Sequence, residues 1–187
     1  MLWITGCASR ITGWDFAEQA LDAARAEASR QGLEAAFEHR NVLDPPPPDK
    51  LGRFDVVLSV GCLALACRDA SMFDRALHNL VATTRFGGRI VLLEPIHEGR
   101  LLRRMLALGE QKWCARAERA GLLKLESRRM CFVPSRLLLA FVELPPALVN
   151  PLFRAGERVL SRLPRALRLA DYTLLLFERQ VPPFSVG

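Results

Sequence analysis

Between residues 10 and 95 the sequence alternates between short apolar runs and longer amphipathic patterns, and this alternation constrains the fold most. The short runs are apolar and partly β-branched, which is typical of strands, and the longer patterns repeat apolar residues at helical spacing. We therefore predict strands at residues 10–15, 33–44, 54–60 and 89–95, and helices at 16–31 and 71–85. A strand–helix–strand order that occurs twice predicts an α/β fold with a doubly wound, mainly parallel sheet.

The later part of the chain has a different pattern. Residues 97–168 contain mostly helical patterns with one strand pattern, and residues 172–180 form a last apolar run. A length of 187 residues suits one domain. We therefore expect a single domain over 1–187, with 10–96 as its core, 97–168 as a helical cap with one strand, and 172–180 as the last strand. The continuously apolar run FDVVLSV further predicts that strand 54–60 is buried on both faces.

Composition narrows the possible partners and the compartment. The net charge is +6, but the basic residues are spread along the chain without interleaved aromatic residues, so no nucleic-acid partner is expected. The five cysteines are odd in number and form no CxxC pair, so we expect no metal site and reduced thiols in a cytoplasmic protein. No signal peptide opens the sequence, and no apolar run approaches the ~20 residues that span a bilayer.

Several motifs together resemble the class I methyltransferases that use S-adenosylmethionine (SAM). ITGWDFAEQALDAAR resembles their second strand and following helix, NVLD their acidic motif after the third strand, FDVVLSVGCLAL their fourth strand and exit loop, and LVATTRFGGRIVLLEPIH the passage to the fifth strand. AERAGLLKLESRR and DYTLLLFERQ resemble the sixth and the closing, antiparallel seventh strand. The resemblance implies a Rossmann-like fold, SAM as cofactor, and residues 10–96 as the cofactor-binding core.

A nicotinamide-dependent dehydrogenase is the main alternative, because it too places an acid at the end of its second strand. A short-chain reductase would offer a tyrosine followed four residues later by lysine. Here Tyr172 is the single tyrosine, and Leu176 occupies the second position. The Gly87–Gly88 turn also favours the methyltransferase.

The resemblance assigns the nucleoside end of the cofactor to two acidic motifs. It implies that Asp15 binds both ribose hydroxyls and that Phe16 lies beside the adenine, although Asp15 could instead cap the next helix and Phe16 could pack in the core. It further implies that Asp44 accepts a hydrogen bond from the adenine amino group and that the Leu43 amide serves a ring nitrogen. Asp before Pro is also a common turn former, so a purely local role for Asp44 stays open.

The methionine end of the cofactor is assigned to Ser59, Val60 and Gly61, which leave strand 54–60 where such sheets bind ligands. Gly61 would let the cofactor approach the backbone, although it could be an ordinary turn glycine. Glu94 and His97 follow the next strand and could face the acceptor. His97 is the candidate general base, with a surface-loop histidine as the alternative.

The expected reaction is methyl transfer from SAM to a small, hydrophobic acceptor. Segments 100–112 and 134–168 combine apolar residues with arginines, which fits a cap over a lipid or an aromatic metabolite. The cap could also rest on a membrane surface through its arginines, or the helices could simply cover the sheet.

The beginning of the chain is too short for the whole family pattern. Gly6 lies in a segment that weakly resembles the glycine-rich loop of the family. It precedes Asp15 by nine residues, whereas a helix alone takes about ten residues. We therefore expect an N-terminal truncation, with the first strand and that loop missing or rebuilt. An exposed sheet edge would follow, which favours a homodimer. The alternative function is a degenerate methyltransferase-like protein without catalysis, acting as a binding partner or a nonfunctional fragment.

Overall fold

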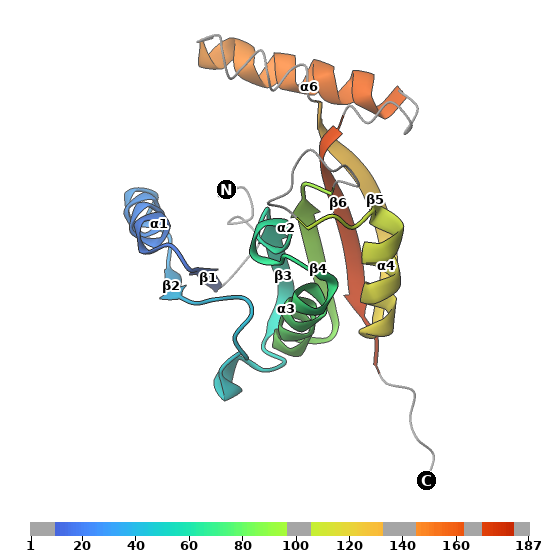
Figure 1. Cartoon of the computed structure of the whole chain (residues 1–187). Helices are drawn as coiled ribbons and strands as arrows, with labels where there is room; N and C mark the ends of the chain where they lie inside the picture. The colour runs from blue at the N-terminus through green and yellow to red at the C-terminus, as the bar shows by residue number, and fades with distance from the viewer. Residues whose placement is uncertain (1–9, 97–105, 133–144, 163–169, 182–187) are drawn as a thin grey trace. The chain divides into compact units, whose positions relative to one another are not determined.

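The computed structural model describes residues 10–96, 106–132, 145–162 and 170–181 (Figure 1). The chain divides into two compact units, Met1–Pro45 and Pro46–Gly187. We expected the first strand to be missing or rebuilt. This expectation concerns residues 1–9, which lie outside the described residues.

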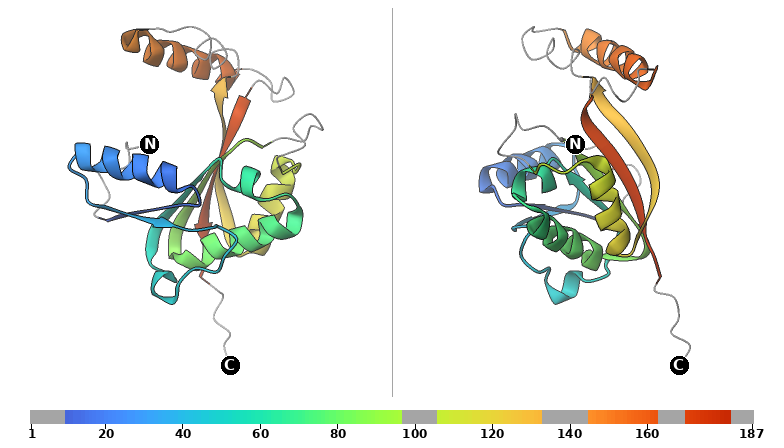
Figure 2. Two further views of the ribbon diagram at one scale, coloured as in Figure 1. Left: turned by 60° about the vertical axis from the view of Figure 1, so that its left-hand side comes forward. Right: turned by 45° about the vertical axis from the view of Figure 1, so that its right-hand side comes forward.

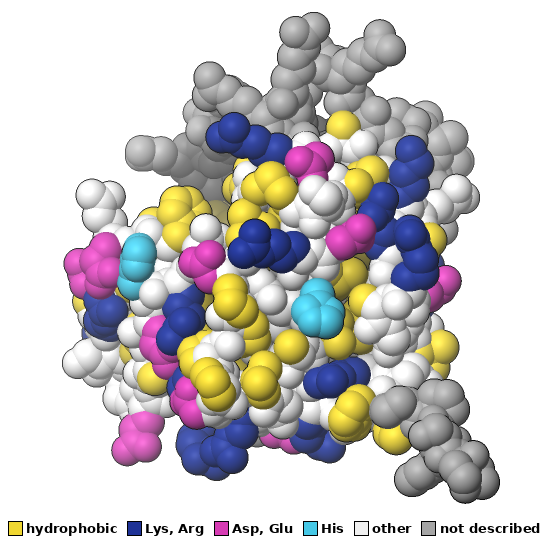
Figure 3. All heavy atoms as spheres, turned by 60° about the horizontal axis from the view of Figure 1, so that its bottom comes forward, with side chains coloured by type: hydrophobic (Ala, Val, Ile, Leu, Met, Phe, Trp, Pro, Cys, Tyr) yellow, Lys and Arg dark blue, Asp and Glu magenta, His cyan; other side chains and the backbone are white. Residues whose placement is uncertain are grey.

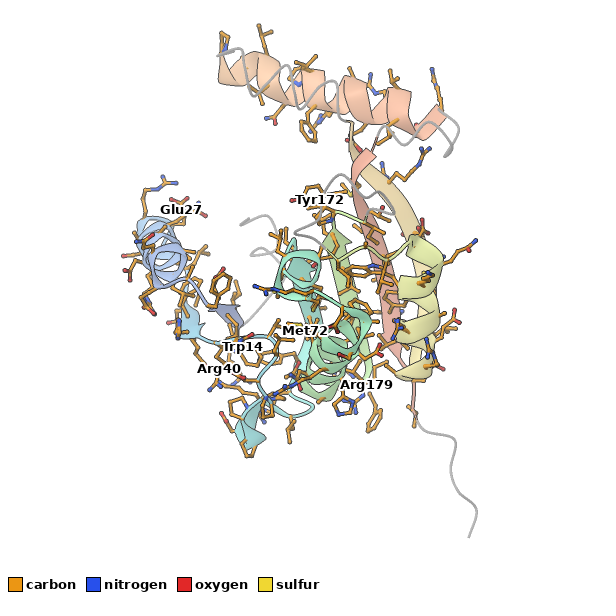
Figure 4. The ribbon with its side chains drawn as sticks, in the orientation of Figure 1. Trp14, Glu27, Arg40, Met72, Tyr172 and Arg179 are labelled. Atoms are coloured by element: carbon orange, nitrogen blue, oxygen red, sulfur yellow. The ribbon has the colours of Figure 1, made fainter. Side chains whose placement is uncertain are left out.

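The first unit is a strand–helix–strand element. Strand β1 (Ile11–Asp15) pairs in parallel with β2 (Ala35–His39), and helix α1 (Glu18–Arg30) connects them. The helix buries Leu21 and Ala28. Gly13 makes room for the Phe37 ring, because a Cβ there would lie 2.8 Å from it and the ring would have to shift. The guanidinium of Arg40 lies 5.5 Å from the centre of the Trp14 ring, and Figure 4 shows these two side chains together.

Strand β2 ends earlier than the sequence predicted. The expected strand covered 33–44, but the pairing stops at His39. The side-chain oxygen of Asn41 accepts a hydrogen bond from the Leu43 amide at 3.0 Å, and its carbonyl accepts one from the Asp44 amide. An asparagine that binds the backbone two residues on stabilises a turn, and four prolines follow it. The local hydrogen bonds of Asn41 therefore replace the strand.

The second unit contains a four-stranded sheet with the order β3-β4-β6-β5. Strand β3 pairs in parallel with β4, whereas β6 runs antiparallel to both β4 and β5 (Figure 2). Its elements are η1 (Pro48–Lys50), β3 (Phe54–Val60), α2 (Leu63–Ala66), α3 (Ala70–Thr83), β4 (Thr84–Glu94), α4 (Glu110–Arg119), β5 (Leu122–Phe132), α6 (Pro146–Arg162) and β6 (Ala170–Arg179). The predicted α/β class and the antiparallel last strand are confirmed.

The core of this unit lies between the sheet and helices α3 and α4. Asp69 begins α3 by accepting hydrogen bonds from the amides of Ser71 and Met72. The helix then buries Phe73, whose ring lies 4.5 Å from that of the buried Trp113 in α4. Buried Ile90, Leu92, Leu175 and Phe177 complete this core from β4 and β6. Contacts between aromatic rings thus connect the two helices over one sheet.

The prediction that strand 54–60 is buried on both faces is wrong. Val56, Leu58 and Val60 point to one face of β3 and are 53%, 38% and 45% exposed. Within the described ranges β3 pairs with β4 alone, so it is an edge strand of its sheet. An edge strand lacks a neighbouring strand on one side, so fewer side chains surround its own than in a central strand. Across the described part of the chain, no helix has the length and apolar character that a membrane span requires.

Candidate functional site

The residues that the sequence analysis singled out fall into both units. Asp15, Phe16, Leu43 and Asp44 belong to Met1–Pro45, whereas Ser59, Val60 and Gly61 belong to Pro46–Gly187. Each group follows the carboxyl end of a parallel strand, which is where open α/β sheets bind ligands. His97 and much of the expected cap lie outside the described residues.

Asp15 combines a structural role with an available oxygen. Its Oδ1 accepts a hydrogen bond from the Ala17 amide at 2.9 Å, at the start of α1. No described residue donates to Oδ2. A carboxylate oxygen can accept more than one hydrogen bond. The N-cap of α1 is Ala17, so Asp15 stabilises the turn before the helix and can still bind two hydroxyl groups of a ligand.

Phe16, next to this carboxylate, lies on the surface. The residue is 72% exposed, and its carbonyl oxygen lies 2.7 Å from Nε2 of His39. Within the described part of the chain, Phe16 therefore does not pack in a core. An exposed ring beside a strand end offers a flat apolar surface to a planar ligand.

The turn after β2 lies at the same end of the first unit as Asp15. Residues Asp15 and His39 are opposite each other in the β1–β2 pair, and the amide of Arg40 donates to the Asp15 carbonyl at 2.8 Å. Asp44 is exposed. The Leu43 amide is already bound to Asn41, so a ligand would have to compete for it. At this end of the unit, Oδ2 of Asp15 is therefore a more available group than the Leu43 amide.

Glu94 organises the corresponding end of the second unit. This residue ends β4 and is fully buried, and its Oε1 accepts hydrogen bonds from Ser59 Oγ at 2.7 Å and from the amides of Cys62 and Leu63. Its Oε2 accepts one from the amide of Ala64 at 3.1 Å. A hydrogen-bonded carboxylate at the beginning of α2 satisfies amides that the helix cannot pair. Glu94 therefore holds the loop after β3 instead of facing an acceptor.

Burial and hydrogen bonding act on Glu94 in opposite directions. Burial raises the pKa of its carboxyl group above the ordinary value, and the hydrogen bonds from Ser59 and the loop amides oppose this shift. The hydroxyl of Ser59 donates its hydrogen to this carboxylate, so toward a ligand its side chain can only accept.

Gly61 and Tyr172 face each other across this loop. Gly61 has φ +61°, a left-handed conformation that favours glycine, and its amide donates to the Leu93 carbonyl at 2.9 Å. A Cβ at this position would lie 3.5 Å from the hydroxyl oxygen of Tyr172 in β6. Sequence reasoning did not assign Tyr172 to the site, because the contact depends on the pairing of β6 with β4.

The backbone of this loop offers the carbonyl of Gly61 to a ligand, since those of residues 62 to 64 already accept from other amides. The amides of residues 61 to 64 all donate within the protein, to Leu93 or to Glu94. No described residue donates to the carbonyl oxygen of Gly61. A positively charged or hydrogen-donating ligand group therefore fits here better than an anion.

Comparisons with known proteins give a family-model match and structures with a similar fold. Residues 2–88 match the family model of a methyltransferase domain. No curated protein matches the sequence.

Several solved structures share the fold. The [4+2]-cyclase SpnF superimposes with a TM-score of 0.66 at 18% identity, over 96% of this chain and 71% of that one. A putative methyltransferase from Bacillus halodurans gives a TM-score of 0.63 at 11% identity, over 95% of this chain and 86% of that one. The N-methyltransferase NodS from Bradyrhizobium japonicum, in complex with S-adenosylhomocysteine, gives a TM-score of 0.60 at 15% identity, over 93% of this chain and 67% of that one. The predicted resemblance to class I methyltransferases is confirmed.

Proposed function

We propose that this chain, which resembles methyltransferases in its matched segment and its fold, transfers a methyl group from SAM to a small, hydrophobic acceptor. The observation that carries the proposal is the position of Asp15. It ends β1 with one oxygen engaged by the helix start and the other without a donor in the described residues. Such a carboxylate suits a pair of ribose hydroxyls.

The first unit fits the nucleoside part of SAM. Asp15 would bind the ribose, the exposed Phe16 ring would lie against the adenine, and the exposed Asp44 carboxylate would accept from the adenine amino group. The Leu43 amide would serve the adenine ring only after exchanging its bond to Asn41.

The second unit fits the methionine part of SAM through Val60 and Gly61. Gly61 has no side chain to fill the space beneath the Tyr172 hydroxyl, and its carbonyl is available to the ammonium group of the cofactor. Ser59 contributes through Glu94, which fixes the loop. The acceptor that this loop offers thus suits the ammonium group of SAM.

Bound SAM supplies an electrophilic methyl group, so the protein has little covalent chemistry to perform. The residues around Asp15 and Gly61 bind and orient, and the surrounding apolar side chains exclude water. His97, three residues after Glu94, is our candidate for taking a proton from the acceptor.

The surroundings of Gly61 support a hydrophobic acceptor, such as a lipid or an aromatic metabolite. Val60 is 45% exposed and Leu65 is 62% exposed, one on each side of the Glu94-bound loop. Helix α6 follows β5 and precedes β6, at the end of the sheet where β4 finishes at Glu94 (Figure 1). The helix is anchored there by the Arg129 guanidinium, which donates to the Leu160 carbonyl at 3.2 Å. These features suit a cap over an apolar pocket.

Transfer of a labelled methyl group tests this function. The full chain is incubated with methyl-labelled SAM and a fractionated extract of hydrophobic metabolites, and label is measured in the organic phase. We expect transfer by the natural chain and a loss of at least tenfold in the Asp15→Asn variant, which keeps one acceptor oxygen for the helix start. Label that stays with SAM in every fraction, although SAM binds, would instead favour the non-catalytic alternative.

A further inference from the structure

Tyr172 lies where four separate segments of the second unit meet. Its hydroxyl oxygen is 3.5 Å and its Cε1 is 3.9 Å from the position of a Cβ on Gly61. The neighbouring Thr173 is opposite Glu94 in the β4–β6 pair, and Tyr172 itself is opposite Met130 in β5. The side chain thus belongs to the end of the sheet that also contains the Glu94-bound loop (Figure 4).

The surroundings of Tyr172 leave its ring in partial contact with solvent. The residue is half-buried, whereas the following Thr173 is buried at 8% exposure. The hydroxyl lies close above the left-handed Gly61, because a Cβ at that position would already be in van der Waals contact with it. A half-buried aromatic side chain beside a strand end can line one side of a ligand site.

We propose that the Tyr172 side chain contacts the sulfonium end of SAM above Gly61 and selects the charged cofactor over its neutral product. This inference rests on the proposed function, because it assigns a residue to the same cofactor site. The geometric basis is the approach of Tyr172 to Gly61, and the chemical basis is the set of groups that this end of the sheet presents.

The chemistry of that set favours a positive ligand group. A phenol ring attracts a cation through its negative face, and its oxygen has lone pairs that face a positive charge favourably. The loop beneath offers the Gly61 carbonyl, while its amides are consumed by Leu93 and Glu94. The sulfonium of SAM is positive, and S-adenosylhomocysteine lacks both this charge and the methyl group. Contact with Tyr172 therefore stabilises SAM more than the product.

A fluorine label reports on this residue directly, since the chain contains one tyrosine. The full chain is prepared with 3-fluorotyrosine and titrated with SAM, while calorimetry measures binding on the same sample. We expect the single fluorine resonance to move with the same saturation as the calorimetric heat, and to move less with S-adenosylhomocysteine. A resonance that stays in place while calorimetry shows saturation would overturn the role of Tyr172 and leave the proposed function intact.

Variants provide an independent reading. Tyr172→Leu is expected to weaken SAM binding about tenfold and S-adenosylhomocysteine binding less than threefold, since only SAM loses a cation–aromatic contact. Phe86→Leu is the matched control, because Phe86 is an exposed aromatic residue of the same unit whose ring stacks on Arg179. It should leave both affinities unchanged. Equal losses for the two ligands in Tyr172→Leu would contradict selection of the charged cofactor.

The failure of the inference and the failure of the proposed function give different results. If the folded chain produces no heat with either SAM or S-adenosylhomocysteine, the proposed function fails and the role of Tyr172 fails with it. If binding heat is present, but the fluorine resonance does not move and Tyr172→Leu keeps the natural ratio of SAM to S-adenosylhomocysteine affinity, only the inference fails.

Discussion

The hydroxyl of Ser59 donates a 2.7 Å hydrogen bond to the carboxylate of Glu94, so the end of β3 is tied to the end of β4 by two buried polar side chains. The same carboxylate accepts from three consecutive backbone amides of the loop that follows β3. This buried group fixes the loop on which the proposed methionine site depends.

Glu94→Gln is expected to destabilise the fold. The amide oxygen of glutamine can replace Oε1, but its NH₂ group faces the Ala64 amide, and two donors cannot pair. Leaving a buried donor unsatisfied costs about 1–3 kcal/mol. Urea unfolding of the natural chain and the variant measures the difference. Glu126→Gln is the control, because Glu126 is exposed on β5 and should change stability by less than about 0.5 kcal/mol. An unchanged midpoint in Glu94→Gln would show that the carboxylate does not hold the loop.

Gly61→Ala tests whether the space beneath Tyr172 is used by a ligand. The left-handed backbone at Gly61 costs an alanine about 1–2 kcal/mol, and the new methyl group would occupy the space above the loop. Gly87→Ala is a matched control, because Gly87 also has positive φ but has no atom within 4 Å of the added Cβ.

Both glycine variants should lose similar stability in thermal unfolding. Gly61→Ala alone should also bind SAM more weakly, by about tenfold or more, because its methyl group blocks a contact. Calorimetry measures the affinity. Equal affinity in the two variants would remove Gly61 from the site.

Cys67 makes the stability of the fold decrease as the pH rises in the alkaline range. Burial raises the pKa of its thiol to about 12, whereas an unfolded chain has a cysteine pKa of about 8.5. The folded protein therefore keeps the proton that the unfolded chain releases. The stabilisation by the neutral thiol is complete below about pH 8.5 and is lost progressively as the pH rises toward 12, with a slope of at most about 1.4 kcal/mol per pH unit.

Urea unfolding at pH 7.5 and pH 9.5 measures this dependence. The natural chain should lose about 1 kcal/mol more between the two pH values than Cys67→Ala does, because alanine has no proton to release. The cost of removing the sulfur itself is present at both pH values and cancels. Parallel losses in the two proteins would mean that the Cys67 thiol titrates normally in the folded state.

The sequence predicted most of the strands because apolar runs form them wherever they lie in the chain. It failed where the structure depends on neighbours in space. Strand 54–60 is apolar throughout, yet Val56 and Val60 are exposed, because its place at the edge of the sheet is not encoded in its own composition. The end of β2 was misplaced because a single side chain, that of Asn41, organises the turn.

The candidate site was predictable in part for the same reason. The place of Asp15 at the end of β1 was predictable, because strand, acid and helix are contiguous in the sequence. Its binding of the ribose stays a prediction. The role of Glu94 was not, since its partners lie 30 to 35 residues earlier in the chain. Tyr172 was missed because the register of β6 against β4 brings it to Gly61, and a register cannot be read from one strand.

The measurement that tests the account most directly is a calorimetric titration of the 187-residue chain and its Asp15→Asn variant with SAM. Asparagine keeps an acceptor for the Ala17 amide, so the melting temperature should be unchanged while the ribose loses a carboxylate. We predict a dissociation constant on the order of micromolar for the natural chain and binding at least about tenfold weaker for the variant. A folded chain that takes up no SAM, or a variant that binds it equally well, would contradict the assignment of Asp15 to the cofactor.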